Sequence, residues 1–120
     1  MDADEALDRL LAVSEEVHAA VVFERSGEAI AATVPGDDAA DIAGLGDAML
    51  VYADSLRPSA QVRRVQAVTP EGDVYVVRED ERAVVAVARP GSLAGLVLHD
   101  LRTLLRSLSR QRRRRVVRAT

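Results

Sequence analysis

The chain has 120 residues, a formal net charge of −3 at pH 7 and no cysteine. A single domain of this size buries roughly two thirds of the surface that its unfolded chain would expose, so it needs no disulfide or metal to fold. The absence of lysine excludes a P-loop and Schiff-base chemistry, because both depend on that residue. An acidic start and the lack of a long apolar run argue against a signal peptide and a membrane span, so we expect a cytoplasmic protein.

Charge is distributed unevenly along the chain. Residues 1–109 contain all 19 acidic residues and ten arginines, whereas the last eleven residues contain six arginines. The sequence therefore divides into a domain at 3–109 and an arginine-rich tail at 110–120. An electrostatic contact with an acidic partner or an anionic surface is one interpretation of the tail, and a solvated chain end is the other. The candidate contact residues are Arg112, Arg113, Arg114 and Arg115.

The first half of the chain predicts a helix, a hairpin and a second helix. Residues 3–17 repeat apolar side chains at steps of three and four, which is typical of a helix packed along one stripe. Strands are expected at 18–25 and 28–33, because both segments are apolar and Ser26-Gly27 between them is a tight-turn signal. The second helix is expected to end near Leu56, shortly before a proline.

The second half predicts a three-strand meander and a final helix. Strands are expected at 62–69, 74–78 and 82–88, with a turn at 70–73 that contains proline and glycine. The first of these strands is the most polar and is predicted to lie at an edge of the sheet. The third is apolar on both faces, so we expect it to be central and covered from both sides. The final helix has one apolar stripe, consisting of Leu93, Val97, Leu101, Leu104, Leu105 and Leu108.

The second helix combines an apolar stripe with many small residues. Gly44 and Gly46 each cost about 1 kcal/mol relative to alanine in a helix interior, and the close approach of another backbone would explain that cost. Two interpretations stay open: the small residues pair with a helix of a second protomer, or they relieve crowding against the chain's own sheet. The stripe predicted to lie on the sheet consists of Ile42, Leu45, Met49, Tyr52 or Ala53, and Leu56.

Two hairpins stand out within this order of elements, one at Arg25–Ala31 with the sequence RSGEAIA and one at Thr69–Val77 with the sequence TPEGDVYVV. Together with the helix–hairpin–helix–meander–helix order they resemble the roadblock/LC7 family over residues 3–108. The resemblance implies an α/β, roadblock/profilin-like fold, in which a five-stranded antiparallel sheet carries one helix on one face and two on the other. It also implies non-enzymatic dimers whose second helices pair and whose third strands join edge to edge. Bacterial members are commonly regulators of small Ras-like GTPases, and the arginine-rich tail departs from the family pattern.

Our functional hypothesis is a non-catalytic homodimer that regulates or scaffolds a small Ras-like GTPase and uses no cofactor or metal. His18 and His99 are the only histidines, and neither belongs to a metal-binding or Ser-His-Asp pattern.

The alternatives are a small-molecule sensor of PAS- or profilin-like shape, and an adaptor that binds an anionic surface through the tail. Nucleic acid is a poor candidate, because three aromatic residues offer too little stacking surface. Membrane contact is expected only peripherally, through the tail or the partner. The predicted dimer interface consists of Ala39, Ala43, Gly46, Leu50, Val62, Arg64 and Gln66.

Overall fold

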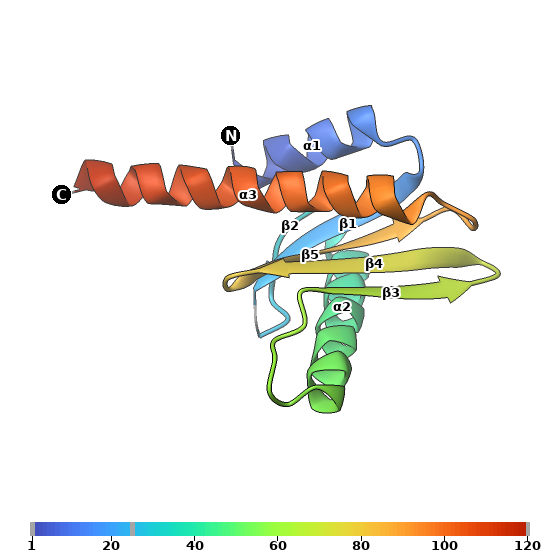
Figure 1. Ribbon diagram of the computed structural model, residues 1–120. Helices are drawn as coiled ribbons and strands as arrows, with labels where there is room; N and C mark the ends of the chain where they lie inside the picture. Colours follow the sequence, from blue (N-terminus) through green and yellow to red (C-terminus); the bar gives the residue numbers. More distant parts are fainter. Residues whose placement is uncertain (1, 25, 120) are drawn as a thin grey trace.

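The computed structural model describes residues 2–24 and 26–119, with side chains described as far as Leu108. The elements in chain order are α1 (Ala3–Val13), β1 (Val17–Glu24), β2 (Ala29–Ala32), α2 (Gly36–Leu56), β3 (Arg64–Thr69), β4 (Gly72–Glu79), β5 (Arg82–Ala88) and α3 (Ala94–Ala119). Within the described residues, five strands form one antiparallel sheet in the order β2-β1-β5-β4-β3 (Figure 1). The α/β fold class and the order of elements predicted from the sequence are confirmed.

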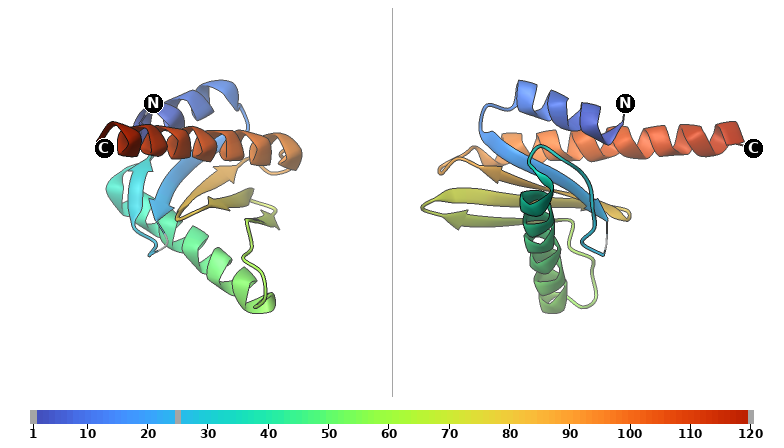
Figure 2. Two further views of the ribbon diagram at one scale, coloured as in Figure 1. Left: turned by 60° about the vertical axis from the view of Figure 1, so that its left-hand side comes forward. Right: turned by 180° about the vertical axis from the view of Figure 1, so that it is seen from behind.

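Helices cover both faces of this sheet (Figure 2). Helix α2 lies on one face and contacts all of the strands, while α1 and α3 lie side by side on the other face. On that second face α1 lies over β1 and β2, and α3 lies over β4 and β5. The central strand is β5, whose residues 83–86 are buried, so the prediction of a central strand covered from both sides is confirmed.

Each face of the sheet has its own apolar core. The core under α1 and α3 contains the largest aliphatic side chains, among them Leu7, Leu101 and Leu105. Five of the six residues in the predicted stripe of α3 are buried there. Leu93 is the exception, because it precedes the helix and its side chain is 60% exposed. The core under α2 is smaller and is built around Phe23 and valines of the central strands.

The first helix is shorter than the sequence predicts. Helix α1 ends at Val13, where Ser14 adopts an extended conformation and donates its backbone N–H to the Leu10 carbonyl at 2.9 Å. Val17 is the first residue of β1 and pairs with Ala88, so its assignment to the helix is wrong. The apolar spacing cannot distinguish a helix from a strand at this point, because Val17 would be buried in either element.

The predicted turn at Ser26-Gly27 is confirmed, and the second turn is confirmed in place but is shorter than 70–73, because Gly72 and Asp73 belong to β4. Gly27 donates its N–H to the Glu24 carbonyl at 2.8 Å and has a φ of +84°, a conformation that glycine adopts without a steric penalty. Arg25, which was assigned to the preceding strand, lies outside the described residues. The second hairpin turns through two residues, so that Thr69 at the end of β3 pairs with Gly72 at the start of β4.

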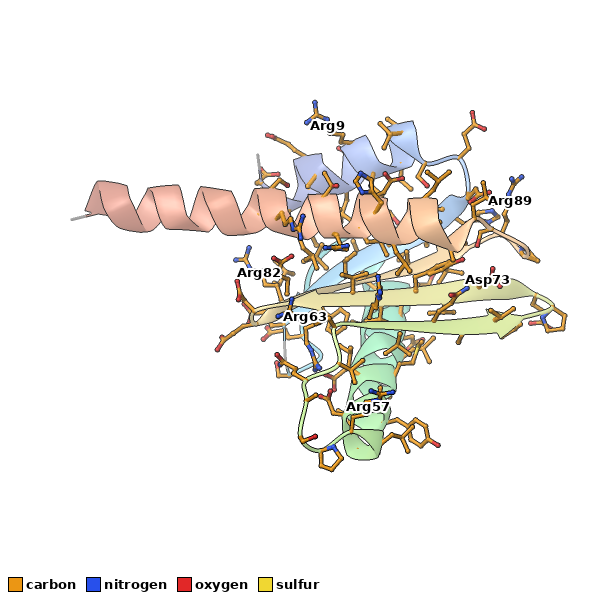
Figure 3. All side chains as sticks on the ribbon, viewed as in Figure 1. Arg9, Arg57, Arg63, Asp73, Arg82 and Arg89 are labelled. Carbon is orange, nitrogen blue, oxygen red and sulfur yellow. The ribbon has the colours of Figure 1, made fainter. Side chains whose placement is uncertain are left out.

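Glu16 fixes the start of α3 against the sheet. Its carboxylate accepts a hydrogen bond from the backbone N–H of Leu93 at 2.7 Å and one from the Arg89 guanidinium at 3.0 Å. The N–H of Leu93, followed by Arg89, lowers the pKa of Glu16 from its ordinary value. Figure 3 shows Arg89 near Asp73, whose carboxylate accepts a hydrogen bond from the Ser92 hydroxyl at 2.9 Å. The loop before α3 is therefore held at two points.

Candidate protein-binding surface

Helix α2 is apolar on both its inner and its outer side. The residues that it buries against the sheet are Ala39, Ala43, Gly46 and Leu50. Surface helices normally place polar and charged residues on the side away from the core, and a helix that is apolar all round is typically buried. The outer side of α2 carries no charge over its last three turns, although it is exposed; we call it the outer α2 face. It consists of Gly44, Leu45, Ala48, Val51, Tyr52, Ser55 and Leu56.

The structure corrects both faces that the sequence assigned to this helix. Leu45, Tyr52 and Leu56 were expected on the sheet, yet they are 46%, 68% and 65% exposed. The small residues expected at a dimer contact are instead buried against the chain's own sheet, so the choice of Ala39, Ala43, Gly46 and Leu50 as interface residues is wrong. Small side chains let the helix approach the sheet closely, which decides the face that it buries.

Gly46 and Gly44 illustrate the difference between the two faces. A Cβ atom on Gly46 would lie 2.9 Å from Cβ of Val85 and 3.0 Å from two ring carbons of Phe23. A Cβ atom on Gly44 would have nothing within 4 Å. Relief of crowding against the chain's own sheet is therefore confirmed for Gly46, whereas Gly44 belongs to the outer α2 face.

Strand β3 adds an open sheet edge. It ends the strand order and pairs with β4, so its predicted edge position is confirmed. The Arg63 carbonyl accepts from the Arg78 N–H at 2.7 Å. Because antiparallel pairing alternates along a strand, the backbone groups of Arg64, Gln66 and Val68 are directed away from the sheet. Such an edge can pair with another strand.

An ion pair joins the end of α2 to the sheet next to this edge. The Asp54 carboxylate accepts two hydrogen bonds from the Arg78 guanidinium, at 2.7 and 3.0 Å, and a third from the Val62 N–H at 3.0 Å. Arg78 also donates to the Val62 carbonyl. The side chain of Arg78 is only 10% exposed, so solvent screens the pair weakly. Asp54 and Arg78 thereby position the loop 57–63 between α2 and β3, and no sequence signal pointed to either residue.

Val62 is placed differently from the prediction. The sequence assigned it to the edge strand and to the dimer interface, but β3 begins at Arg64. Because both backbone groups of Val62 are bound within the chain by Asp54 and Arg78, Val62 cannot extend the open edge. Arg64 and Gln66 are exposed on β3, and their role in a dimer stays a prediction.

The remaining candidate residues are not brought together. His18 is exposed on β1 and His99 is exposed on α3. In the part of the chain that the structure describes, no group of three or more potential metal ligands forms, and no helix is long and apolar enough to cross a membrane. Helix α3 continues through most of the arginine-rich tail, and the contact predicted for Arg112–Arg115 falls outside the described side chains.

Comparison with solved structures identifies the fold. A roadblock/LC7 domain from Streptomyces avermitilis superposes with a TM-score of 0.83 at 16% identity, over 92% of this chain and 98% of that one. The chain has the roadblock/LC7 fold. MglB of Myxococcus xanthus matches this fold with a TM-score of 0.75 at 13% identity, over 90% of this chain and 92% of that one. Profilin II of Acanthamoeba castellanii superposes with a TM-score of 0.67 at 14% identity, over 92% of this chain and 98% of that one. No protein-family model and no curated protein matches the sequence.

Within the roadblock/LC7 fold, the outer α2 face and the β3 edge are neighbours. Figure 1 shows the C-terminal part of α2 projecting past β3, which it contacts, and the Asp54–Arg78 pair joins α2 to β4, the strand beside β3. We call the combination of the outer α2 face with residues 64–68 of β3 the α2–β3 surface. It offers exposed apolar side chains and unpaired strand groups on adjacent elements, which is the composition expected of a surface that binds protein.

Proposed function

We propose that the chain is a non-catalytic binding module of the cytoplasm that forms a homodimer and regulates or scaffolds a small Ras-like GTPase. The observation that carries this proposal is the outer α2 face, which is exposed and free of charge. Val51, Tyr52 and Leu56 are each more than 60% exposed in the single chain. Full burial of a large apolar side chain contributes about 1.5–3 kcal/mol, so covering these residues with a second protomer would stabilise a dimer substantially.

The two parts of the α2–β3 surface support the same assembly. Pairing of two outer α2 faces would bury the apolar side chains, and pairing of two β3 edges would satisfy the backbone groups of residues 64–68. A symmetric dimer uses the same patch on both protomers, and an outer α2 face beside a strand edge meets that requirement. This is also the arrangement that the roadblock/LC7 resemblance implies.

The GTPase partner is proposed from that resemblance and from the nature of the surface. Bacterial proteins of the roadblock/LC7 type are commonly regulators of small Ras-like GTPases. The same resemblance implies that this chain acts by binding and by reshaping the GTPase's own site. A sensor of PAS- or profilin-like shape and an adaptor acting through the tail stay alternatives.

Light scattering of the purified protein tests the dimer. We expect a mass of twice the 12.9 kDa chain at high micromolar concentration. The double variant Val51→Asp, Tyr52→Asp places two charges on the outer α2 face and is expected to be monomeric with an unchanged circular dichroism spectrum. Leu96→Asp is the matched control, because Leu96 is 59% exposed on α3 and lies outside the α2–β3 surface. A monomeric wild type would contradict the dimer. A Leu96→Asp control that is as monomeric as the double variant would contradict the α2–β3 surface as its contact.

Nucleotide assays with small Ras-like GTPases of the same organism test the partner. We expect the wild type and the Leu96→Asp control to change the rate of GTP hydrolysis or of nucleotide release by one of these GTPases. The monomeric variant is expected to lose most of that effect, and the protein alone is expected to hydrolyse no GTP. A stable dimer that binds none of them in either nucleotide state would refute the GTPase assignment and leave the dimer intact.

A further inference from the structure

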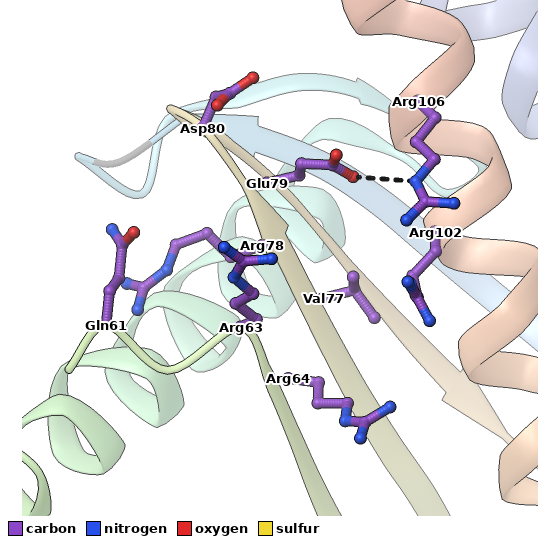
Figure 4. A pocket seen from close by; sticks show the side chains of 9 residues that line it. All are labelled: Gln61, Arg63, Arg64, Val77, Arg78, Glu79, Asp80, Arg102 and Arg106. Atoms are coloured by element: carbon purple, nitrogen blue, oxygen red, sulfur yellow. Dashed lines mark ion pairs between the residues drawn. The ribbon is translucent and has the colours of Figure 1, made fainter.

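A hollow lined by arginines lies between the β3–β4 hairpin and α3. Its volume is about 420 Å³, within the range of small-molecule sites (Figure 4). Figure 4 shows Arg63 and Arg64 on the β3 side and Arg102 and Arg106 on α3, with Val77 of β4 between the two sides. The five arginines that line the hollow are Arg63, Arg64, Arg78, Arg102 and Arg106.

These arginines differ in how far they are already engaged. Arg78 is bound by Asp54 and the Val62 carbonyl, so it serves the fold. Arg106 has one partner in this hollow, Glu79, at the long distance of 3.8 Å. Among the residues whose side chains the structure describes, no ion pair joins Arg63, Arg64 or Arg102. Three to four guanidinium groups are therefore available to a ligand.

The concentration of positive charge is unusual for this protein. The domain at 1–109 carries 19 acidic residues against ten arginines, yet half of those arginines line this one hollow. Two acidic residues, Glu79 and Asp80, are among the described residues of the lining. A concave surface lined by one sign of charge concentrates ions of the opposite sign. The hollow is therefore a positive site on a negative domain.

We propose that this hollow binds a phosphate-bearing anion with at least two negative charges. The planar guanidinium group donates parallel hydrogen bonds that match phosphate oxygens, and cations on two sides can hold two phosphate groups at once. None of the described residues that line the hollow is aromatic, so they offer no surface on which a base could stack, and the site recognises the phosphate part of its ligand. A soluble diphosphate and a phospholipid headgroup both carry this chemistry, and the experiment separates the two sources.

Calorimetric titration of the full chain with inorganic pyrophosphate at low salt tests the site. We expect saturable binding of one pyrophosphate per chain, with an affinity that falls as salt is added. The variant Arg63→Gln, Arg102→Gln removes one unpaired cation from each side of the hollow and should weaken binding about tenfold or more. Both residues are exposed and neither belongs to the α2–β3 surface, so folding and the proposed dimer should be unchanged.

The tail supplies the matched control, because it also carries arginines. The variant Arg112→Gln, Arg113→Gln removes the same charge and should change the affinity by less than about twofold. No saturable binding up to millimolar pyrophosphate, or equal weakening by the two variants, would overturn the proposal. Phosphatidylcholine vesicles containing phosphatidic acid distinguish the source: binding that depends on Arg63 and Arg102 identifies a headgroup, and pyrophosphate binding without vesicle binding identifies a soluble anion.

Discussion

Replacing Gly46 with alanine tests how closely α2 packs on the sheet. The new Cβ atom would lie 2.9 Å from Cβ of Val85 and 3.0 Å from the Phe23 ring, and both neighbours are completely buried. Neither can move aside without displacing the core, and overpacking of this kind costs about 1–3 kcal/mol. Alanine recovers about 0.5–1 kcal/mol of helix propensity. We therefore expect Gly46→Ala to lower the free energy of unfolding by about 1–2 kcal/mol.

Gly44→Ala is the matched control on the same helix. Nothing lies within 4 Å of its Cβ position, so only the gain in helix propensity remains. We expect this variant to raise the free energy of unfolding by about 0.5–1 kcal/mol. The two substitutions are chemically identical and lie two residues apart, yet they should change stability in opposite directions.

Urea denaturation followed by circular dichroism measures both effects in the monomeric Val51→Asp, Tyr52→Asp background, because Gly44 lies on the proposed dimer contact and dimerisation would add to stability. With a urea dependence of about 2 kcal/mol per molar, the midpoint should fall by about 0.5–1 M for Gly46→Ala and rise by about 0.25–0.5 M for Gly44→Ala. If Gly46→Ala is as stable as Gly44→Ala, α2 stands further from the sheet than the structure shows, and the assignment of its inner face fails.

Three further predictions concern the ion pair, the start of α3 and its stripe. Asp54→Asn should cost about 2–3 kcal/mol in thermal unfolding, because it leaves the guanidinium of Arg78 buried without its counter-charge; a loss below about 0.5 kcal/mol would contradict this. Glu16 has a lowered pKa in the folded state, so its contribution to stability is present above its ordinary value of 4.5 and is lost as the pH falls through the lowered folded value. The melting temperatures of Glu16→Gln and the wild type should therefore converge in acid. A difference that stays constant with pH would contradict a stabilising role of the ionised Glu16 carboxylate. Leu93→Ala should change the free energy of unfolding by less than about 0.5 kcal/mol, whereas Leu101→Ala should lower it by about 2–5 kcal/mol. Equal losses would contradict the exposed position of Leu93.

The residues close together in sequence were sufficient to predict the helices and strands and their order along the chain. The turn at Gly27 depends on a conformation that glycine adopts easily, and the hairpin before Gly72 depends on proline and glycine, so both were readable from neighbouring residues. The uninterrupted apolar run at 82–88 identified β5 as the central strand, because only a strand covered on both faces is apolar throughout. The edge position of β3 followed from its polar residues, whereas the strand order of the sheet, with β1 beside β5, came from the structure.

Tertiary structure decided which face of α2 became the surface. The helix is apolar on both its inner and its outer side, so its pattern could not tell the side that meets the sheet from the side that meets solvent. The choice depends on the space above Phe23 and Val85, which come from β1 and β5 and meet only in the folded sheet. The Asp54–Arg78 pair and the arginine hollow likewise join residues that are distant in sequence. Periodicity reports the neighbours of a residue along the chain, whereas close packing and charge pairing depend on neighbours that only the fold supplies.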